Sequence, residues 1–563
     1  MSPMASPVAS RASLLGLPLE LRDQIYYYYF KADGGYVSDG DKLLQASGQT
    51  AQISLILACR SIASETRHLP FTLNPITFST VYRPDWRKQA LMLNQIAHHH
   101  IYLLRGMVLR LGRLLTPDMY EEPSPEYSQY MHIVMEEVAE FIRNWDRRTE
   151  LSTEVRNSCA FFDAQEFRDG AGSRVGAASI RLRGDDSTVA LKRTRSYLLR
   201  QLADKHPTEF SQAIEEILPG WNDSHSIDDF FSLGFDSWAM PTRSEVKKMV
   251  DLMQNTKYWQ NGDAWYHLGF DIPGYNGSKY RYKRKYWFSA TAQAIRFLRQ
   301  LPRKQRFLIS KLILNEERYA AAFPESHIIG MIPFCRENPK LHVEHRINLW
   351  RNILARGDDK RIRGLMFCIE GPPLVLDNTP EWHQIVPGFI GRAFTGFILH
   401  LLEALKEGLP SDSYSLIVSG YPDLNRATEV FSTSIKPHIA WLTANMTDCI
   451  AYRLIAPSGH HEYPFPTRNS TGGVAPVSER SAIIQCDFTL DQPWDWEKIY
   501  DESEVSTVST LGRLSIFGVG NGDDFLDVTT DMLDWESILR ESYEMEELSE
   551  GLFAEPCNDR YLA

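Results

Sequence analysis

Helical segments dominate the chain from residue 86 to about residue 320. Their length and apolar spacing favour helices over strands. A glycine-rich piece, 170–186, is expected to be an exposed loop or a subdomain boundary. No internal repeat is present, so a solenoid has no support. We therefore predict an α+β protein that is mainly α, with helices at 88–115, 126–147, 190–205, 243–257 and 289–300.

Short strands are expected at a few places only. A helix is expected at 338–355 and a loop at 457–480, which is rich in Pro, Gly, Ser and Thr. These features divide the larger, mostly helical body into a helical part, 86–320, and a mixed α+β part, 321–520. The expected strands are 76–82, 305–314, 364–370, 414–419 and 481–490.

Composition indicates a globular protein inside the cell. The 563 residues are 43% hydrophobic and 12% aromatic, which is far from a disordered composition. Seven cysteines are too few for a disulfide scaffold, and their odd number favours a reducing compartment. We expect a cytoplasmic or nuclear location. Residues 1–12 open the chain with a Ser/Pro/Ala-rich stretch and are expected to be disordered.

One apolar stretch, 385–405, is long enough to be considered as a membrane span. It contains Arg392, His400 and Glu403, whereas a span of about 20 residues is almost free of charge. We predict a buried amphipathic helix there. No secretory signal precedes it, because the apolar run after Arg11 is short. No membrane partner is expected.

Charge is segregated along the chain. Residues 279–311 contain eleven Lys and Arg and no acid, whereas residues 521–550 contain eleven Asp and Glu and one Arg. Helix-type apolar spacing predicts an acidic amphipathic helix in the segment 521–563. We hypothesise that it packs back on the basic block, although an ordinary helix docked elsewhere has the same spacing. The apolar stripe comprises Trp535, Ile538, Leu539, Met545, Leu548 and Leu552, with Ser542 among them.

The basic block has the composition of a nucleic-acid site. Tyr and Trp side chains alternate with its cations, and such a mixture suits phosphates and stacked bases. A solvated charged face is the alternative, and the acidic segment would compete for the same cations. The candidate cations are Lys279, Arg281, Lys283, Arg284 and Lys285.

No catalytic motif is recognisable. The chain has no phosphate-binding loop of the Walker type, no Gly-x-Ser-x-Gly elbow and no Cys-x-x-Cys pair. His342 and His345 have a spacing of one helical turn but lack the His-Glu-x-x-His pattern of zinc enzymes. We expect no metal, no cofactor and no enzymatic activity. An enzyme without local motifs is the alternative.

The N-terminal region predicts a small helical module at 13–85. Leu17, Leu21 and Ile25 recur at four-residue steps, and Pro18 suits a first helical turn. A second helix is expected at 51–67. The four aromatic residues 26–29 advance about 100° each along a helix, so one or two should be exposed.

This region resembles the F-box. Leu17-Pro18-Leu19-Glu20-Leu21, then Ile25-Tyr26, then Leu55 and Cys59-Arg60 with Ile62 match its pattern over about 13–82. The match is closer to the F-box-like module that opens many uncharacterised fungal proteins, and 323–338 resembles the rest of such chains. Residues 31–50 lengthen the gap between the two helices.

The resemblance implies a small helical bundle that docks on the Skp adaptor of a cullin ubiquitin ligase, while the rest of the chain recruits a substrate. We therefore expect a protein-interaction protein, with substrate recruitment as one form of that role. The same residues could instead only hold the N-terminal helices together. The implied contact residues are Leu17, Pro18, Glu20, Leu21, Ile25, Tyr26, Leu55 and Cys59.

Overall fold

The computed structural model describes residues 13–120, 189–253, 265–268, 279–354, 384–385, 387–435, 483–489, 526–527 and 541–548, with several positions between 130 and 142. The expectations for 1–12, 170–186, 364–370 and 457–480 lie outside these residues. So do much of 126–147 and most of 521–563.

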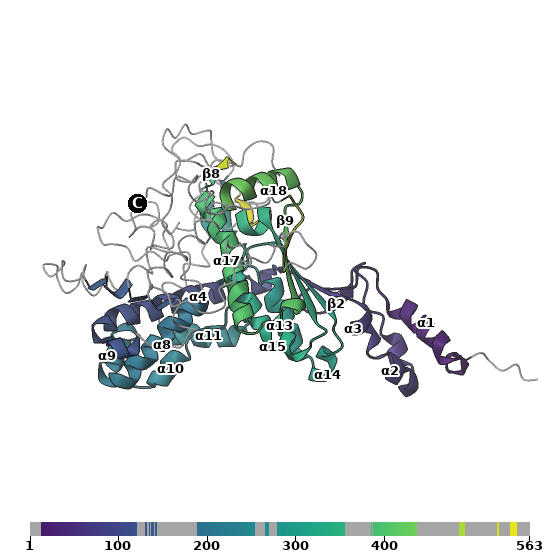
Figure 1. The fold of residues 1–563 in the computed structure, drawn as a ribbon, viewed down its shortest axis with the longest axis horizontal. Helices are drawn as coiled ribbons and strands as arrows, with labels where there is room; N and C mark the ends of the chain where they lie inside the picture. Colours follow the sequence, from purple (N-terminus) through teal and green to yellow (C-terminus); the bar gives the residue numbers. More distant parts are fainter. Residues whose placement is uncertain are drawn as a thin grey trace, which may run out of the picture.

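A seven-stranded sheet organises the body (Figure 1). Its order is β10-β9-β7-β6-β3-β1-β2, and every neighbouring pair is parallel except β1 with β2. The prediction of a mainly α protein with a few short strands is therefore wrong, and the fold is α/β. The strands are β1 Tyr36–Ser38, β2 Leu43–Gln45, β3 Ile76–Ser79, β6 Lys311–Glu316, β7 His342–Asn348, β9 Tyr414–Ser419 and β10 Ile484–Cys486.

Burial alternates along β3 and β6, as the period of two in a β-strand requires. In β6, Leu312, Leu314 and Glu316 are buried, and the intervening residues are half-buried. Parallel pairing sets Phe78 beside Leu314 and Leu314 beside His345, so one face of the sheet is continuous core. The expected strands 76–82 and 414–419 are confirmed by β3 and β9, and parts of 305–314 and 481–490 by β6 and β10.

The helix expected at 338–355 is wrong. Residues 342–348 form β7, and a π-helical turn, η6 Leu349–Ile353, follows. Because His342 and His345 are three positions apart, an odd number, a strand directs them to opposite faces. His342 contacts Ser415 Oγ at 3.2 Å, whereas His345 lies in the core. The pairing of these histidines on one helical face is thus overturned.

Helices cover the core face of the sheet. They are α13 Ala290–Gln300, η5 Pro324–Met331, α15 Ile332–Glu337 and α17 Pro387–Lys406. Ile390, Phe394 and Leu401 of α17 are buried, which confirms the buried amphipathic helix expected at 385–405. Among the described residues, no helix is both long and apolar enough to cross a membrane. α18 Leu424–Val430 and η9 Phe431–Ile435 contribute Ala427, Val430 and Phe431 to the same core, and the body also contains the short elements α14 Arg303–Arg306 and η8 Ser411–Ser413.

A separate helical part has its own core. Its helices are α4 Pro84–Leu111, α8 Val189–Lys205, α9 Pro207–Ile217, α10 Ile227–Phe231 and α11 Arg243–Leu252, with the short turns η3 Gly112–Leu114 and η4 Pro117–Met119. The helices expected at 88–115, 190–205, 243–257 and 289–300 are confirmed in position by α4, α8, α11 and α13. Inside this core, the Glu137 carboxylate lies 3.1 Å from both Arg105 and Arg195.

The N-terminal helices lie at one end of the molecule, beyond β2, and α8–α10 lie at the other (Figure 1). These N-terminal elements are η1 Leu14–Gly16, α1 Leu19–Phe30, η2 Ser54–Leu57, α2 Arg60–Thr66 and α3 Leu69–Leu73. The same region also supplies β1, β2 and β3 to the central sheet. The residues 31–50, between the expected N-terminal helices, contain the β1–β2 hairpin, so the N-terminal region is joined to the body through shared strands.

Two small sheets complete the described structure. One pairs β11 Leu526–Asp527 with β8 Gln384–Ile385. The other has the order β12-β5-β4, with β4 Tyr266–Leu268, β5 Lys279–Arg284 and β12 Tyr543–Leu548. The acidic segment does return to the basic block, but residues 543–548 form a strand. The expected helix is wrong at these residues because β5 offers unpaired backbone groups that β12 fills.

Candidate functional site

Exposed apolar side chains concentrate on the N-terminal helices. Eight of the eleven exposed large hydrophobic residues in the described chain lie between positions 15 and 57. Tyr28 is 79% exposed and Leu57 is 76% exposed, which is extreme for such side chains. We name this set the N-terminal apolar surface; it comprises Leu15, Leu19, Leu21, Ile25, Tyr27, Tyr28, Ile53 and Leu57.

The residues of the F-box-like pattern divide into two groups. Tyr26 is buried with Phe30 and Ile62 in a small core, and Leu17 and Leu55 are half-buried. The other members, Pro18, Glu20, Leu21, Ile25 and Cys59, are exposed. Of the four aromatic residues 26–29, two are exposed, in line with the helical argument. The pattern therefore contains both packing residues and a free face.

A set of hydrogen bonds and an ion pair, here called the polar bracket, holds the exposed face of α1 in a fixed position relative to the small core. The Glu65 carboxylate of α2 accepts hydrogen bonds from Tyr26 Oη at 2.8 Å and from Arg22 Nη2 at 2.9 Å. Arg22 also donates to the Leu17 carbonyl at 2.8 Å. The hydrogen bonds from Tyr26 and Arg22 lower the pKa of Glu65. The bracket ties α1 to α2 without using the exposed apolar side chains.

The basic block does not form a free cationic face. Arg281 Nη2 lies 2.5 Å from Glu546 and Lys283 Nζ lies 2.9 Å from Glu544, both on β12. The same two cations lie over the Trp265 ring, at 4.6 and 4.4 Å. Lys279 and Arg284 pair with Leu548 and Tyr543 through the backbone register. A nucleic acid would have to displace the acidic strand, so this arrangement counts against the nucleic-acid interpretation.

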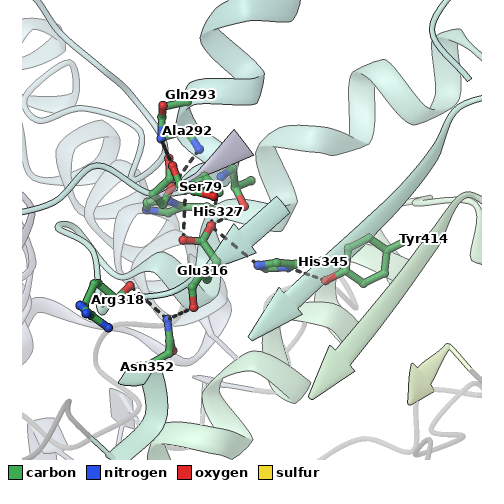
Figure 2. A network of polar contacts seen from close by, with 12 residues as sticks. Ser79, Ala292, Gln293, Glu316, Arg318, His327, His345, Asn352 and Tyr414 are labelled. Carbon is green, nitrogen blue, oxygen red and sulfur yellow. Dashed lines mark hydrogen bonds and ion pairs between the residues drawn. The ribbon is translucent and has the colours of Figure 1, made fainter. Parts of the chain in front are cut away.

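A buried polar network lies where β6, β7 and β9 meet α13 and η5 (Figure 2). The Glu316 carboxylate accepts hydrogen bonds from the backbone N–H groups of Ala290 and Thr291, at 3.2 and 3.0 Å, and from Thr291 Oγ1 at 2.9 Å. It therefore stabilises the first turn of α13. Burial nevertheless raises the pKa of Glu316 to about 7, with these hydrogen bonds opposing the rise.

Two neutral histidines extend this network. His327 Nε2 donates to the Ala322 carbonyl at 2.9 Å, so its Nδ1 accepts from Ser289 Oγ at 2.7 Å. His345 Nδ1 lies 2.7 Å from Tyr414 Oη, and its Nε2 lies 3.8 Å from Glu316. Burial lowers the pKa of His327 to about 4 and that of His345 to about 3.

The hydrogen bond between Ser289 and His327 resembles that between a catalytic nucleophile and its base, but its surroundings indicate a structural role. Ser289 Oγ already accepts from Ala292 N at 2.9 Å as the N-cap of α13, and both Ser289 and His327 are buried. With both side chains 1% exposed, this hydroxyl is shielded from solvent. The network thus joins strands to helices.

One open pocket lies between α4, α8 and the chain after α10. It has a volume of about 250 Å³ and is lined by His100, Lys192, Arg200 and Asp236, among others. Burial lowers the pKa of Lys192, and the Asp236 carboxylate opposes this effect. A primary amine in such a place is more nucleophilic than a surface lysine. Sequence reasoning missed the pocket because its residues come from distant segments.

Among the described residues, no group of three His, Cys, Asp or Glu side chains could hold a metal ion. Comparisons with protein-family models, with curated proteins and with solved structures return no match.

Proposed function

We propose that this chain is an intracellular, non-enzymatic interaction protein that binds a protein partner through its N-terminal apolar surface. The partner that fits the sequence pattern is an Skp-type adaptor of a cullin ubiquitin ligase. In that arrangement the α/β body would carry the surface that recruits a substrate. The observation that carries the proposal is the concentration of exposed apolar side chains in the N-terminal region that contains the F-box-like pattern, with Leu21 and Ile25 belonging to both.

Burial of these exposed side chains against a partner would supply binding free energy. Burying one large apolar side chain at an interface contributes about 1.5–3 kcal/mol, and exposed aromatic residues are enriched at interface centres. Tyr26, Phe30 and Ile62, rather than the exposed residues, provide the small core. Changing the exposed side chains should therefore cost little folding stability, whereas it would remove apolar area from the binding surface.

Rigidity supports the same interpretation. The Arg22–Glu65–Tyr26 bracket holds α1 against α2. The hydrogen bond of 2.8 Å between Tyr29 Oη and Ser54 Oγ holds η2 beside α1. A surface held in place before binding loses less conformational entropy on association. The N-terminal apolar surface is therefore preorganised for binding.

The test compares two matched leucines by calorimetric titration with a purified Skp adaptor. Leu19, 51% exposed, is the first residue of α1, and Leu424, 41% exposed, is the first residue of α18 on the body. An acid at either position is compatible with a helix N-terminus. We expect Leu19→Asp to weaken binding at least about tenfold, a loss of about 1.4 kcal/mol, and Leu424→Asp to leave it unchanged.

A second variant, Leu57→Asp, extends the test from α1 to η2. It should weaken binding to a similar degree, since Leu57 belongs to the same surface. Circular dichroism of each variant establishes that it is folded. Absence of adaptor binding by folded wild-type protein, or equal effects of Leu19→Asp and Leu424→Asp, would refute the proposal.

A further inference from the structure

A second candidate site lies at the carboxyl ends of the parallel strands. β3, β6 and β7 run in the same direction, so their last residues share one edge of the sheet. In α/β sheets of this type, ligands commonly bind in the crevice outside the carboxyl ends. Arg318 follows β6 by two residues, and Arg351 lies in η6 after β7.

Three cations gather at this edge. Arg318 and Arg351 both approach the Glu541 carboxylate, Arg318 in a close ion pair and Arg351 at 4.0 Å. Lys285 is held next to them, because its backbone N–H donates to the Ser542 carbonyl at 2.8 Å. The Arg318 side chain is only 11% exposed. Burial and the nearby Arg351 charge lower the pKa of Arg318 to about 10, and Glu317 opposes this effect.

Aromatic rings line the same edge. The Arg318 guanidinium lies over the Trp287 ring at 5.9 Å, and Lys285 Nζ lies over the Tyr82 ring at 5.4 Å. Tyr82 and Trp287 contact each other, with ring centroids 5.3 Å apart. These contacts restrict the movement of the Arg318 and Lys285 side chains. The aromatic rings also shield part of the cationic site from water.

Polar atoms at this edge are left without hydrogen-bond partners within the described structure. They are Thr80 Oγ1, Tyr82 Oη, Arg318 Nε and Asn352 Oδ1. Asn352 is fully buried, and its Nδ2 donates to the Arg318 carbonyl at 3.2 Å, which places it beside Arg318 (Figure 2). Buried polar groups are nearly always hydrogen-bonded, so a group of unpaired ones indicates a ligand or ordered water.

We propose that this edge is a binding site for a phosphate-type oxyanion, and that the C-terminal strand places Glu541 in it as an internal stand-in. The arginine fork matches carboxylate and phosphate oxygens equally in geometry, and a phosphate group offers more charge than one carboxylate. Glu541 lies two residues before β12, which is held to β5 by backbone pairing and partly exposed ion pairs. An external phosphate would therefore compete with a contact that can be released.

The test uses the full-length chain and calorimetric titration with inorganic pyrophosphate and with adenosine diphosphate. Glu541→Gln removes the carboxylate from the site. Glu546→Gln is the matched control, because it makes the same charge change nearby and removes the ion pair with Arg281 instead. We expect Glu541→Gln to bind pyrophosphate at least about tenfold more tightly than wild type, and Glu546→Gln to bind like wild type.

Combining Arg351→Gln with Glu541→Gln should abolish the tighter pyrophosphate binding that is expected of Glu541→Gln alone. Arg351 is partly exposed, so this substitution spares the fold more than a change at Arg318 would. Tighter binding of adenosine diphosphate than of pyrophosphate identifies a nucleoside phosphate as the ligand class, and equal binding identifies the phosphate group alone. Equal binding by Glu541→Gln and Glu546→Gln, or no binding by Glu541→Gln at millimolar pyrophosphate, would overturn the proposal.

Discussion

Replacing Glu316 by Gln should change how the stability of the protein depends on pH. Two effects compete at this carboxyl group. Burial disfavours the charge, whereas the N–H groups of Ala290 and Thr291 at the start of α13 favour it. Burial wins, and the pKa rises from 4.5 to about 7. In the folded protein Glu316 is therefore largely protonated in mildly acidic solution.

The magnitude follows from the size of the rise. One pKa unit corresponds to about 1.4 kcal/mol, so ionised Glu316 costs about 3 kcal/mol of folding free energy. An acid with a raised folded pKa contributes no penalty below its unfolded pKa, and the full penalty is present above its folded pKa. Wild type should thus lose about 2–3 kcal/mol relative to Glu316→Gln between pH 5 and pH 8.

The comparison with the variant is needed because buried histidines act in the opposite direction. Burial lowers the pKa of His99 and His327 to about 4 and that of His345 to about 3. Their stabilising contribution is present above the unfolded value of 6.5 and is lost as pH falls toward these folded values. The difference between wild type and variant cancels this shared background.

The assay is guanidinium unfolding of wild type, Glu316→Gln and a control variant, Glu209→Gln, at an exposed position of α9, at pH 5, 6, 7 and 8. The advantage of Glu316→Gln over wild type should grow with pH, whereas Glu209→Gln should follow wild type. Infrared spectra should also show a protonated carboxylic acid band that titrates near pH 7 and disappears in Glu316→Gln. A difference that does not vary with pH, or that grows toward low pH, would show that the helix N-terminus outweighs burial.

Two further predictions concern the helical part. Glu137→Gln leaves Arg105 and Arg195 buried without their shared carboxylate, so it should cost about 3–5 kcal/mol in unfolding experiments. Glu216→Gln, which breaks the more exposed pair with Arg110, should cost less than about 1 kcal/mol, and similar losses for both variants would contradict this reasoning. Lys192 should react with a small acylating reagent at lower pH than the exposed Lys247, because burial lowers the pKa of Lys192. Mass spectrometry of the modified sites measures both rates, and equal pH dependence would count against a nucleophilic amine in the pocket.

The helices were accessible from the sequence because their signal is local. In α4, α8, α13 and α17, residues three and four apart share one face, so a single segment shows the whole pattern. The strands β3 and β9 were found for a similar reason, since each is a short apolar segment whose pattern lies within a few residues, alternating in β3 and nearly continuous in β9. Of the eight residues of the N-terminal apolar surface, the sequence pattern singled out only Leu21 and Ile25 as contact residues, because it does not show which neighbouring side chains face outward.

Tertiary structure decided the features that depend on distant partners. β7 is a strand because β6 and β9 flank it, although its own residues, with histidines three apart, allow a helical interpretation. Residues 543–548 follow a helical stripe, yet pairing with β5 makes them a strand and brings Glu541 to Arg318. Glu316, His345 and Tyr414 meet only because parallel register aligns three separate strands. Local spacing determines which residues can share a face, but backbone pairing between remote segments determines what that face meets.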